Sequence, residues 1–249
     1  MIRDRLGQHF LIDRSVALRI AGYADLVDTD RVLEIGPGTG NLTEVLAPRA
    51  SRVYSIEVDP HLAGGLLGRF SNVDVMNADA LTVELPDYNK IVSNLPYQIS
   101  SKITYRLLSR PFDLAVLMFQ REFALRMTAP VGSERYGRLA MIVGFLCRVE
   151  IMETVPKTAF QPVPAVNSAV VRLHPRQGRL DVDVQKFMRL VEGLFGLRRK
   201  KVKKGLAALG IGREKLTELF GELDLDPKLL EKRPEELSPD EAAMLSRAM

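Results

Sequence analysis

The tetrapeptide Asn94-Leu95-Pro96-Tyr97 is the most specific chemical motif in the sequence. The Asn94 carboxamide oxygen and the Leu95 carbonyl are hydrogen-bond acceptors. Pro96 restricts the local backbone, and Tyr97 offers a ring on which a base can stack. An amine on an aromatic base is a poor nucleophile, so acceptors for its protons favour reaction at that nitrogen. The motif indicates chemistry on the exocyclic amine of an extruded base, although in isolation it could also be a plain turn.

A glycine-rich turn lies upstream, where residues 34–40 read Glu-Ile-Gly-Pro-Gly-Thr-Gly. Glycines such as Gly36 and Gly38 let the backbone approach a ligand closely. Their spacing differs from the dinucleotide fingerprint G-x-G-x-x-G, and the turn lacks the Lys-Ser/Thr pair of a phosphate-binding P-loop. Glu34 suits the cationic amino-acid end of S-adenosylmethionine better than a pyrophosphate. By itself, the turn could equally be a tight connection between a strand and a helix.

Two acidic residues extend this pattern. Glu57 lies about 20 residues after the glycine turn, where nucleoside-binding α/β folds place a carboxylate that accepts hydrogen bonds from ribose hydroxyls. Asp79 follows the next apolar run and could accept a hydrogen bond from an adenine amino group. Each acid alone could be a solvated loop residue or a helix N-cap. Together with the turn, they predict a nucleoside-containing ligand.

These residues need a scaffold that brings strand ends together. The runs 31–35, 52–56, 73–76 and 90–93 are β-branched, and each is followed by a segment with helical spacing. This alternation predicts a parallel sheet with helices on both faces and a ligand at the carboxyl ends of the strands. Further strands are expected at 113–119 and 169–173, whereas 137–150 mixes helical and strand patterns.

The carboxy-terminal part has a different character. Three prolines in residues 155–165 predict an ordered loop without regular structure, which delivers Phe160 to a specific place. Past Pro175 the strand pattern ends and helical patterns take over. We therefore expect two domains, a catalytic one over residues 1–175 and a small all-helical one over 176–249.

A dense basic run falls in the second domain, with six cations in seven positions on an expected helix. So many like charges repel one another, and phosphate neutralisation explains them better than a solvated helix face. The run predicts RNA contact, which Arg3 and Arg5 could extend. Its members are Arg198, Arg199, Lys200, Lys201, Lys203 and Lys204.

Composition excludes several other classes. The net charge of +4 is compatible with a polyanionic partner, and no apolar run reaches the roughly 18 residues that span a bilayer. The start of the chain has no export signal, so we expect a cytoplasmic enzyme. The single cysteine, Cys147, is expected to be a buried inert thiol. His9, His61 and His174 lie far apart without clustered ligands, so no metal site is expected.

The chain resembles the small-subunit ribosomal RNA adenine N6,N6-dimethyltransferases, a family of class I methyltransferases, over essentially its whole length. The motifs that carry the resemblance are residues 7–11, 34–40, 56–59, 77–80, 94–97 and 160–168. The resemblance implies a Rossmann-like α/β domain with a mainly parallel seven-stranded sheet, followed by a helical carboxy-terminal domain. It also implies S-adenosyl-L-methionine as the cofactor.

The resemblance further implies roles for individual residues. The target base would be held by Asn94, Tyr97 and Phe160. His9 departs from the asparagine that is usual in bacterial relatives, so it could either donate to the cofactor or have a capping or packing role. The residues expected to bind the cofactor are His9, Leu11, Gly36, Gly38, Glu57, Asp79 and Asn94.

The substrate implied by the resemblance is small-subunit rRNA within an assembling 30S-type subunit. The enzyme would be a monomer. Its targets would be two adjacent adenosines in a hairpin near the 3′ end. Three alternatives stay open. They are a macrolide-resistance type methyltransferase of large-subunit rRNA, a non-catalytic ribosome-assembly or RNA-binding protein, and a nicotinamide dehydrogenase, which the glycine spacing disfavours.

Overall fold

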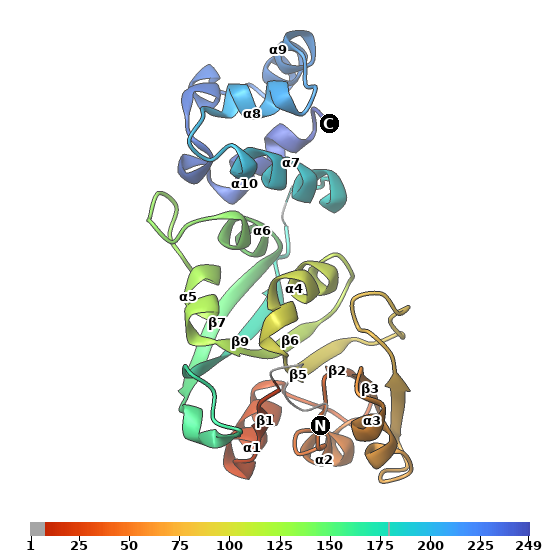
Figure 1. Cartoon of the computed structure of the whole chain (residues 1–249). Coiled ribbons are helices and arrows are strands. Elements are labelled where there is room, and N and C mark those ends of the chain that lie inside the picture. The colour runs from red at the N-terminus through yellow and green to blue at the C-terminus, as the bar shows by residue number, and fades with distance from the viewer. Residues whose placement is uncertain (1–7, 179) are drawn as a thin grey trace. The chain divides into compact units, whose positions relative to one another are not determined.

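The computed structural model describes residues 8–178 and 180–249, which form two compact units (Figure 1). The first unit comprises the described residues up to Ala124 together with Val149–Pro175. The second comprises Leu125–Arg148 and Arg176–Met249. The division after residue 175 coincides with the end of the strand pattern. The segment 125–148, which a single boundary at 175 assigns to the first domain, packs with the helical unit instead.

A seven-stranded sheet forms the centre of the first unit, with strand order β4-β3-β2-β5-β6-β9-β7. Strands β4, β3, β2, β5 and β6 pair in parallel, and β9 runs antiparallel to β6. This mainly parallel sheet confirms the predicted fold class. The strands are β2 (Arg31–Ile35), β3 (Arg52–Glu57), β4 (Val73–Asn77), β5 (Lys90–Asn94), β6 (Leu114–Gln120), β7 (Cys147–Val155) and β9 (Ser168–Pro175).

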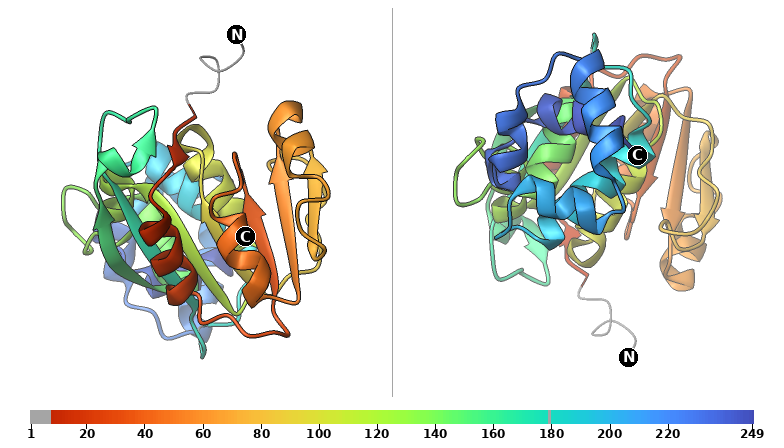
Figure 2. Two further views of the ribbon diagram at one scale, coloured as in Figure 1. Left: turned by 90° about the horizontal axis from the view of Figure 1, so that it is seen from below. Right: turned by 90° about the horizontal axis from the view of Figure 1, so that it is seen from above.

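Both faces of this sheet are buried. Val32 and Val92 join α1 and α2 in one apolar cluster, while the alternate residues Leu33 and Ile91 are buried as well. Because successive side chains point to opposite faces, helices must cover both sides, as Figure 2 shows. The helices from α1 to α5 are α1 (Arg14–Tyr23), α2 (Thr43–Leu46), α3 (Pro60–Leu66), α4 (Ser100–Leu108) and α5 (Arg121–Met127).

A second, two-stranded sheet joins the start of the described chain to the proline-rich segment. Strand β1 (Phe10–Leu11) pairs antiparallel with β8 (Phe160–Gln161), so that Leu11 lies opposite Phe160. The expectation of a loop without regular structure at 155–165 was therefore wrong for part of the segment, which holds the end of β7, the 3-10 turn η3 (Lys157–Ala159) and β8. The pairing is short because Pro162 has no backbone N–H with which to extend it.

The second unit is helical. The segment 137–150, whose pattern was mixed, resolves into α6 followed by the start of β7, and Cys147 is buried there as predicted. Phe145 of α6 packs against Phe187 of α7, with ring centroids 4.6 Å apart. No helix in the described part of the chain is long and apolar enough to cross a membrane. The helices are α6 (Arg138–Leu146), α7 (Val184–Gly196), α8 (Val202–Ala208), α9 (Arg213–Glu222) and α10 (Pro239–Ser246).

A buried ion pair ties the starts of two central strands together. Asp30, which is 3% exposed, precedes β2 and accepts a hydrogen bond of 2.8 Å from the Nζ of Lys90, the first residue of β5. Asn89 and the backbone N–H of Val27 also donate to Asp30. Burial alone would raise the pKa of Asp30, but these hydrogen bonds outweigh it and lower the pKa.

We expect Asp30→Ala to lower the free energy of unfolding by about 3 kcal/mol, because it leaves the Lys90 ammonium buried without its carboxylate. Urea denaturation at neutral pH measures this loss. Asp28→Ala is the matched control, since Asp28 is exposed on the same loop and its loss should stay within about 0.5 kcal/mol. Equal losses in the two variants would contradict a stabilising role for the ion pair.

Candidate cofactor and base-binding site

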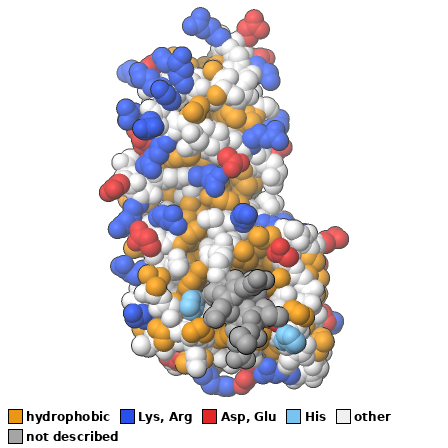
Figure 3. Space-filling view, viewed as in Figure 1, with side chains coloured by type: hydrophobic (Ala, Val, Ile, Leu, Met, Phe, Trp, Pro, Cys, Tyr) orange, Lys and Arg blue, Asp and Glu red, His pale blue; other side chains and the backbone are white. Residues whose placement is uncertain are grey.

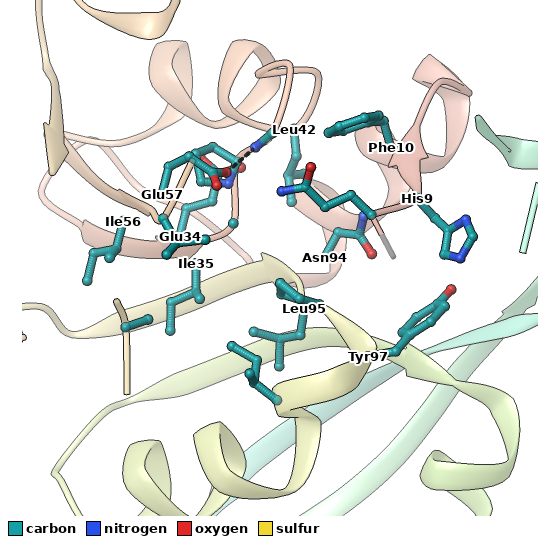
Figure 4. A pocket seen from close by; sticks show the side chains of 18 of the residues that line it. His9, Phe10, Glu34, Ile35, Leu42, Ile56, Glu57, Asn94, Leu95 and Tyr97 are labelled. Carbon is teal, nitrogen blue, oxygen red and sulfur yellow. Dashed lines mark hydrogen bonds between the residues drawn. The ribbon is translucent and has the colours of Figure 1, made fainter. Parts of the chain in front are cut away.

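A cavity of about 390 Å³ lies at the carboxyl ends of the parallel strands. Its size falls in the range of pockets that bind drug-sized ligands. Figure 4 shows Glu34 and Glu57 at one end of the cavity and His9 and Tyr97 at the other, with Asn94 between them. The predicted site residues that line it are His9, Leu11, Gly36, Gly38, Glu57, Asp79, Asn94, Leu95, Pro96 and Tyr97.

The glycine turn packs directly against the Asn-Leu-Pro-Tyr motif. Gly36 has φ +68°, and a Cβ built on it would lie 3.1 Å from Cγ of Pro96. Gly38 has φ +59°, and its Cβ would lie 2.8 Å from the ring of Phe10. Any larger residue would therefore be strained and crowded at either position. Because Gly36 and Gly38 lack side chains, the glycine turn and the Asn-Leu-Pro-Tyr motif can line one cavity.

Two acids, Glu57 at the end of β3 and Asp79 just after β4, accept hydrogen bonds that hold neighbouring turns in shape. The Glu57 carboxylate, which is 2% exposed, accepts hydrogen bonds of 3.0 Å from the backbone N–H groups of Gly38 and Asp59. Asp79 is exposed, and its Oδ1 accepts from the N–H of Leu81 at 2.8 Å. Each carboxylate oxygen has a second lone pair, so both acids can also accept from a ligand.

At the other end of the cavity, Tyr97 is held by two neighbours. Its hydroxyl shares a hydrogen bond of 2.7 Å with Oγ of Ser168, and its ring centroid lies 5.8 Å from that of His9. His9 Nδ1 lies 2.8 Å from the carbonyl of Pro162. Because a carbonyl only accepts, Nδ1 carries the proton in this contact. The ring of Tyr97 therefore has a fixed position at the cavity wall.

Phe160 does not lie at this wall. It is 1% exposed and packs in the apolar cluster that includes Leu11 and Val16. The family resemblance implied that Phe160 holds the target base together with Asn94 and Tyr97. In the structure, the side chain of Phe160 in β8 points into the core. A fully buried ring offers no face to a base, and a part for Phe160 in holding the target base stays a prediction.

Three residues that sequence reasoning missed also shape the cavity. Phe10 packs on Gly38, and Asn41 donates its Nδ2 to the Leu11 carbonyl at 2.5 Å, which ties β1 to the glycine turn. Ser168 holds the Tyr97 hydroxyl. Only Asn41 gave a signal, as a polar residue directly after the glycine turn. The other two contacts join segments that are far apart in the chain.

The basic run of the second unit is not on one helix, contrary to expectation. Its first four residues lie between α7 and α8, and only Lys203 and Lys204 are within α8. Arg3 and Arg5 lie outside the described residues. Figure 3 shows Lys and Arg side chains spread over the face of this unit.

Acidic partners neutralise half of the run. Glu231 accepts hydrogen bonds from Lys201 at 2.6 Å and from Lys203 at 2.5 Å, and these contacts lower the pKa of Glu231 to about 2. Nε of Arg198 lies 3.8 Å from Oε2 of Glu235. These pairs relieve the self-repulsion on which the RNA prediction relied. Arg199, Lys200 and Lys204 have no acidic partner among the described residues, so they are the cations available to a polyanion.

Glu34 is a buried carboxyl group in the cavity wall. It is 1% exposed, and its Oε2 accepts from Oγ1 of Thr43 at 2.7 Å and from Oγ of Ser55 at 2.9 Å. Burial raises the pKa of Glu34 to about 7, with the nearby negative charge of Glu57 adding to the shift and the two hydroxyls opposing it. No cation of the described residues pairs with it. A cationic ligand would supply the missing partner.

We expect the stability of the protein to fall as the pH rises from about 4.5 to about 7, because folded Glu34 binds its proton more tightly than the unfolded chain does. Glu34→Gln removes this dependence. The variant should gain up to roughly 3 kcal/mol relative to wild type by pH 8, with no gain at pH 4. Urea denaturation across this range measures the difference. The exposed Glu84→Gln is the control; a difference between Glu34→Gln and wild type that does not change with pH would contradict the shifted pKa.

The chain is similar to known proteins over most of its length. The family model for ribosomal RNA adenine dimethylase matches residues 1–245. A probable ribosomal RNA small subunit methyltransferase A of Methanothermobacter thermautotrophicus is 46% identical over 249 residues, which cover 96% of this chain and 88% of that protein. Among solved structures, a dimethyladenosine transferase from Plasmodium falciparum is 30% identical, with a TM-score of 0.79 over 96% of this chain and 95% of the other.

A second solved structure, the 23S rRNA methyltransferase ErmE, is 32% identical and has a TM-score of 0.69 over 96% of this chain and 98% of the other. The family model and the relative from Methanothermobacter thermautotrophicus each span nearly the whole sequence, which includes the glycine turn, both acids and the Asn-Leu-Pro-Tyr motif. On these matches, the chain belongs to the ribosomal RNA adenine dimethylase family.

Proposed function

We propose that the protein transfers methyl groups from S-adenosyl-L-methionine to N6 of adenosines in small-subunit ribosomal RNA. The observation that carries this proposal is the contact between Gly36 and Pro96, which joins a nucleoside-binding turn and an amine-binding motif in one cavity. A methyl donor and a methyl acceptor must meet within such a space. The family and the printed names of its relatives support the same reaction.

The residues at the glycine end of the cavity fit the cofactor. Glu57 would accept from the ribose hydroxyls and Asp79 from the adenine amino group. The buried Glu34 would face the cationic amino-acid end, which supplies the positive charge that this carboxylate lacks. The bare backbone of Gly36 and Gly38 leaves room for close approach. His9 and Leu11 would complete the wall from β1.

The residues at the other end would bind the target base. The bound cofactor supplies an electrophilic methyl group. The Asn94 carboxamide oxygen and the Leu95 carbonyl accept the protons of the adenine amine and orient its nitrogen for in-line attack. Tyr97, held by Ser168, provides the stacking surface. Once methylated, the nitrogen is cationic and acidic, so its proton can pass to water without a strong base.

The names of the relatives favour small-subunit rRNA over the alternatives. The relative that is 46% identical is named for the small subunit, although ErmE, which is named for 23S rRNA, shares the fold. We propose as the substrate two adjacent adenosines in a hairpin near the 3′ end of small-subunit rRNA. The enzyme would act as a monomer, on an assembling subunit in the cytoplasm. The helical unit, together with residues 125–148, would contact the RNA.

We expect Asn94→Ala to lower the rate of methyl transfer about 100-fold, because it removes a positioned hydrogen-bond acceptor from the reacting amine. Unmodified small ribosomal subunits, labelled cofactor and nucleoside analysis provide the measurement. Wild-type protein should yield N6,N6-dimethyladenosine in small subunits only. Thermal unfolding at the wild-type temperature would show that the fold of Asn94→Ala is intact. Label in large subunits alone would contradict the proposed substrate.

The paired and unpaired cations of the basic run should differ in RNA binding. Replacing Arg199, Lys200 and Lys204 with glutamine should reduce the slope of log K against log salt by about 2 to 3, since each phosphate contact contributes roughly 0.7 to 0.9. Replacing Lys201 and Lys203 should change the slope by less than one, because Glu231 already neutralises them. Filter binding to an rRNA fragment measures both. An equal reduction of the slope per removed charge in the two variants would contradict the assignment of Arg199, Lys200 and Lys204 as the RNA-binding cations.

A further inference from the structure

The wall of the cavity that carries Asp79 is a loop without regular secondary structure. It follows β4 and is shaped by its own hydrogen bonds. The N–H groups of Thr82 and Val83 donate to the Asp79 carbonyl at 3.0 and 2.9 Å, and Leu81 donates to the Asp79 carboxylate. Ala80 and Leu81 line the cavity together with Asp79. These local bonds fix the shape of the turn, and the N–H of Ala78, which donates to the Glu57 carbonyl at 3.0 Å, ties the start of the loop to the end of β3.

Arg106 ties the other side of the loop to helix α4. It lies in the last turn of α4, and its guanidinium donates through Nη1 to the carbonyl of Leu81 and through Nη2 to the carbonyl of Val83. The side chain is half-buried. A planar guanidinium presents its donors in a fixed fork, so two carbonyls that it holds at once cannot move independently. One side chain thus clamps the loop on both sides of Thr82.

The same helix carries the base-binding motif at its other end. Helix α4 begins directly after the 3-10 turn η2 (Tyr97–Ile99), and the hydroxyl of Ser100 donates to the Pro96 carbonyl at 3.4 Å. Ile103 and Leu107, on the inner face of α4, are buried. A packed helix of this kind moves as a unit. Its start therefore fixes the Asn-Leu-Pro-Tyr motif, and its end fixes the loop of Asp79.

We propose that Arg106 is a positioning residue, which holds the Asp79 carboxylate where it recognises the adenine amino group of the cofactor. The proposal rests on the cofactor assignment made above and adds a residue to it. Asp79 accepts the Leu81 N–H through Oδ1, and Oδ2 accepts no hydrogen bond within this turn. Through α4, Arg106 also links the adenine wall to the Asn-Leu-Pro-Tyr motif.

The test compares two ligands in three proteins. Binding of S-adenosylhomocysteine and of S-inosylhomocysteine, whose purine has an oxygen in place of the 6-amino group, is measured by calorimetry. The proteins are wild type, Arg106→Met and Arg110→Met, a control that removes an exposed arginine just beyond the same helix. Wild type should prefer the adenine ligand about ten-fold or more, because the carboxylate cannot accept from the inosine oxygen.

In Arg106→Met the Kd for S-adenosylhomocysteine should rise about ten-fold, and the preference for adenine should fall to about two-fold, since the loop loses both charge-assisted hydrogen bonds. Arg110→Met should match wild type. In methyl transfer, KM for the cofactor should rise about ten-fold in Arg106→Met while kcat changes less than about three-fold. Arg106→Lys, which keeps a charged donor, should restore part of the preference.

A loss of affinity in Arg106→Met that leaves the preference for adenine intact would overturn the proposal, because a general loss of structure weakens both ligands alike. Affinities equal to those of Arg110→Met would overturn it as well. Failure of the wild-type protein to bind S-adenosylhomocysteine is a separate result, which would instead contradict the proposed cofactor. Thermal unfolding of each variant shows whether the fold is intact.

Discussion

The approach of the Gly36 backbone to Pro96 is the contact on which the site depends. It exists because β2 and β5 are parallel neighbours, so the turn after one strand meets the motif after the other. Strands β3 and β4 continue the sheet on the far side of β2 and add Glu57 and Asp79 at the same edge. The sheet thus places the wall proposed to bind the cofactor and the wall proposed to bind the target amine side by side.

The placement of these residues could be predicted because it follows from local patterns. Each lies within a few residues of the end of a β-branched run, and a parallel sheet gathers such positions at one edge. Contacts between distant segments could not be predicted in this way. The pairing of β1 with β8 turned Phe160 into the core, and Glu231 lies about 30 residues after the lysines that it neutralises. Arg106 showed no signal, because its partners are backbone carbonyls, which every residue has.

Two carboxylates are buried at the end of the cavity that would hold the cofactor. Glu57 is satisfied by backbone N–H groups, whereas Glu34 has only hydroxyl donors and therefore holds a proton near neutral pH. Such a group is electrostatically unfavourable without a cation and favourable with one. The energetic cost of burying Glu34 is thus part of the preference for a positively charged ligand. Uncharged nucleosides of similar shape would leave that cost in place.

The segment 125–148 leaves the first unit, contributes α6 to the second, and returns as β7. The chain therefore passes between the units three times, after residues 124, 148 and 175. A fragment cut at residue 176 would lack Phe145, the partner of Phe187, and would expose an apolar surface on α7. The helical unit is for this reason not an interchangeable module. A chimera that exchanges the helical unit between relatives must carry α6 as well. Insertions or deletions in residues 125–148 would therefore change the packing of the helical unit.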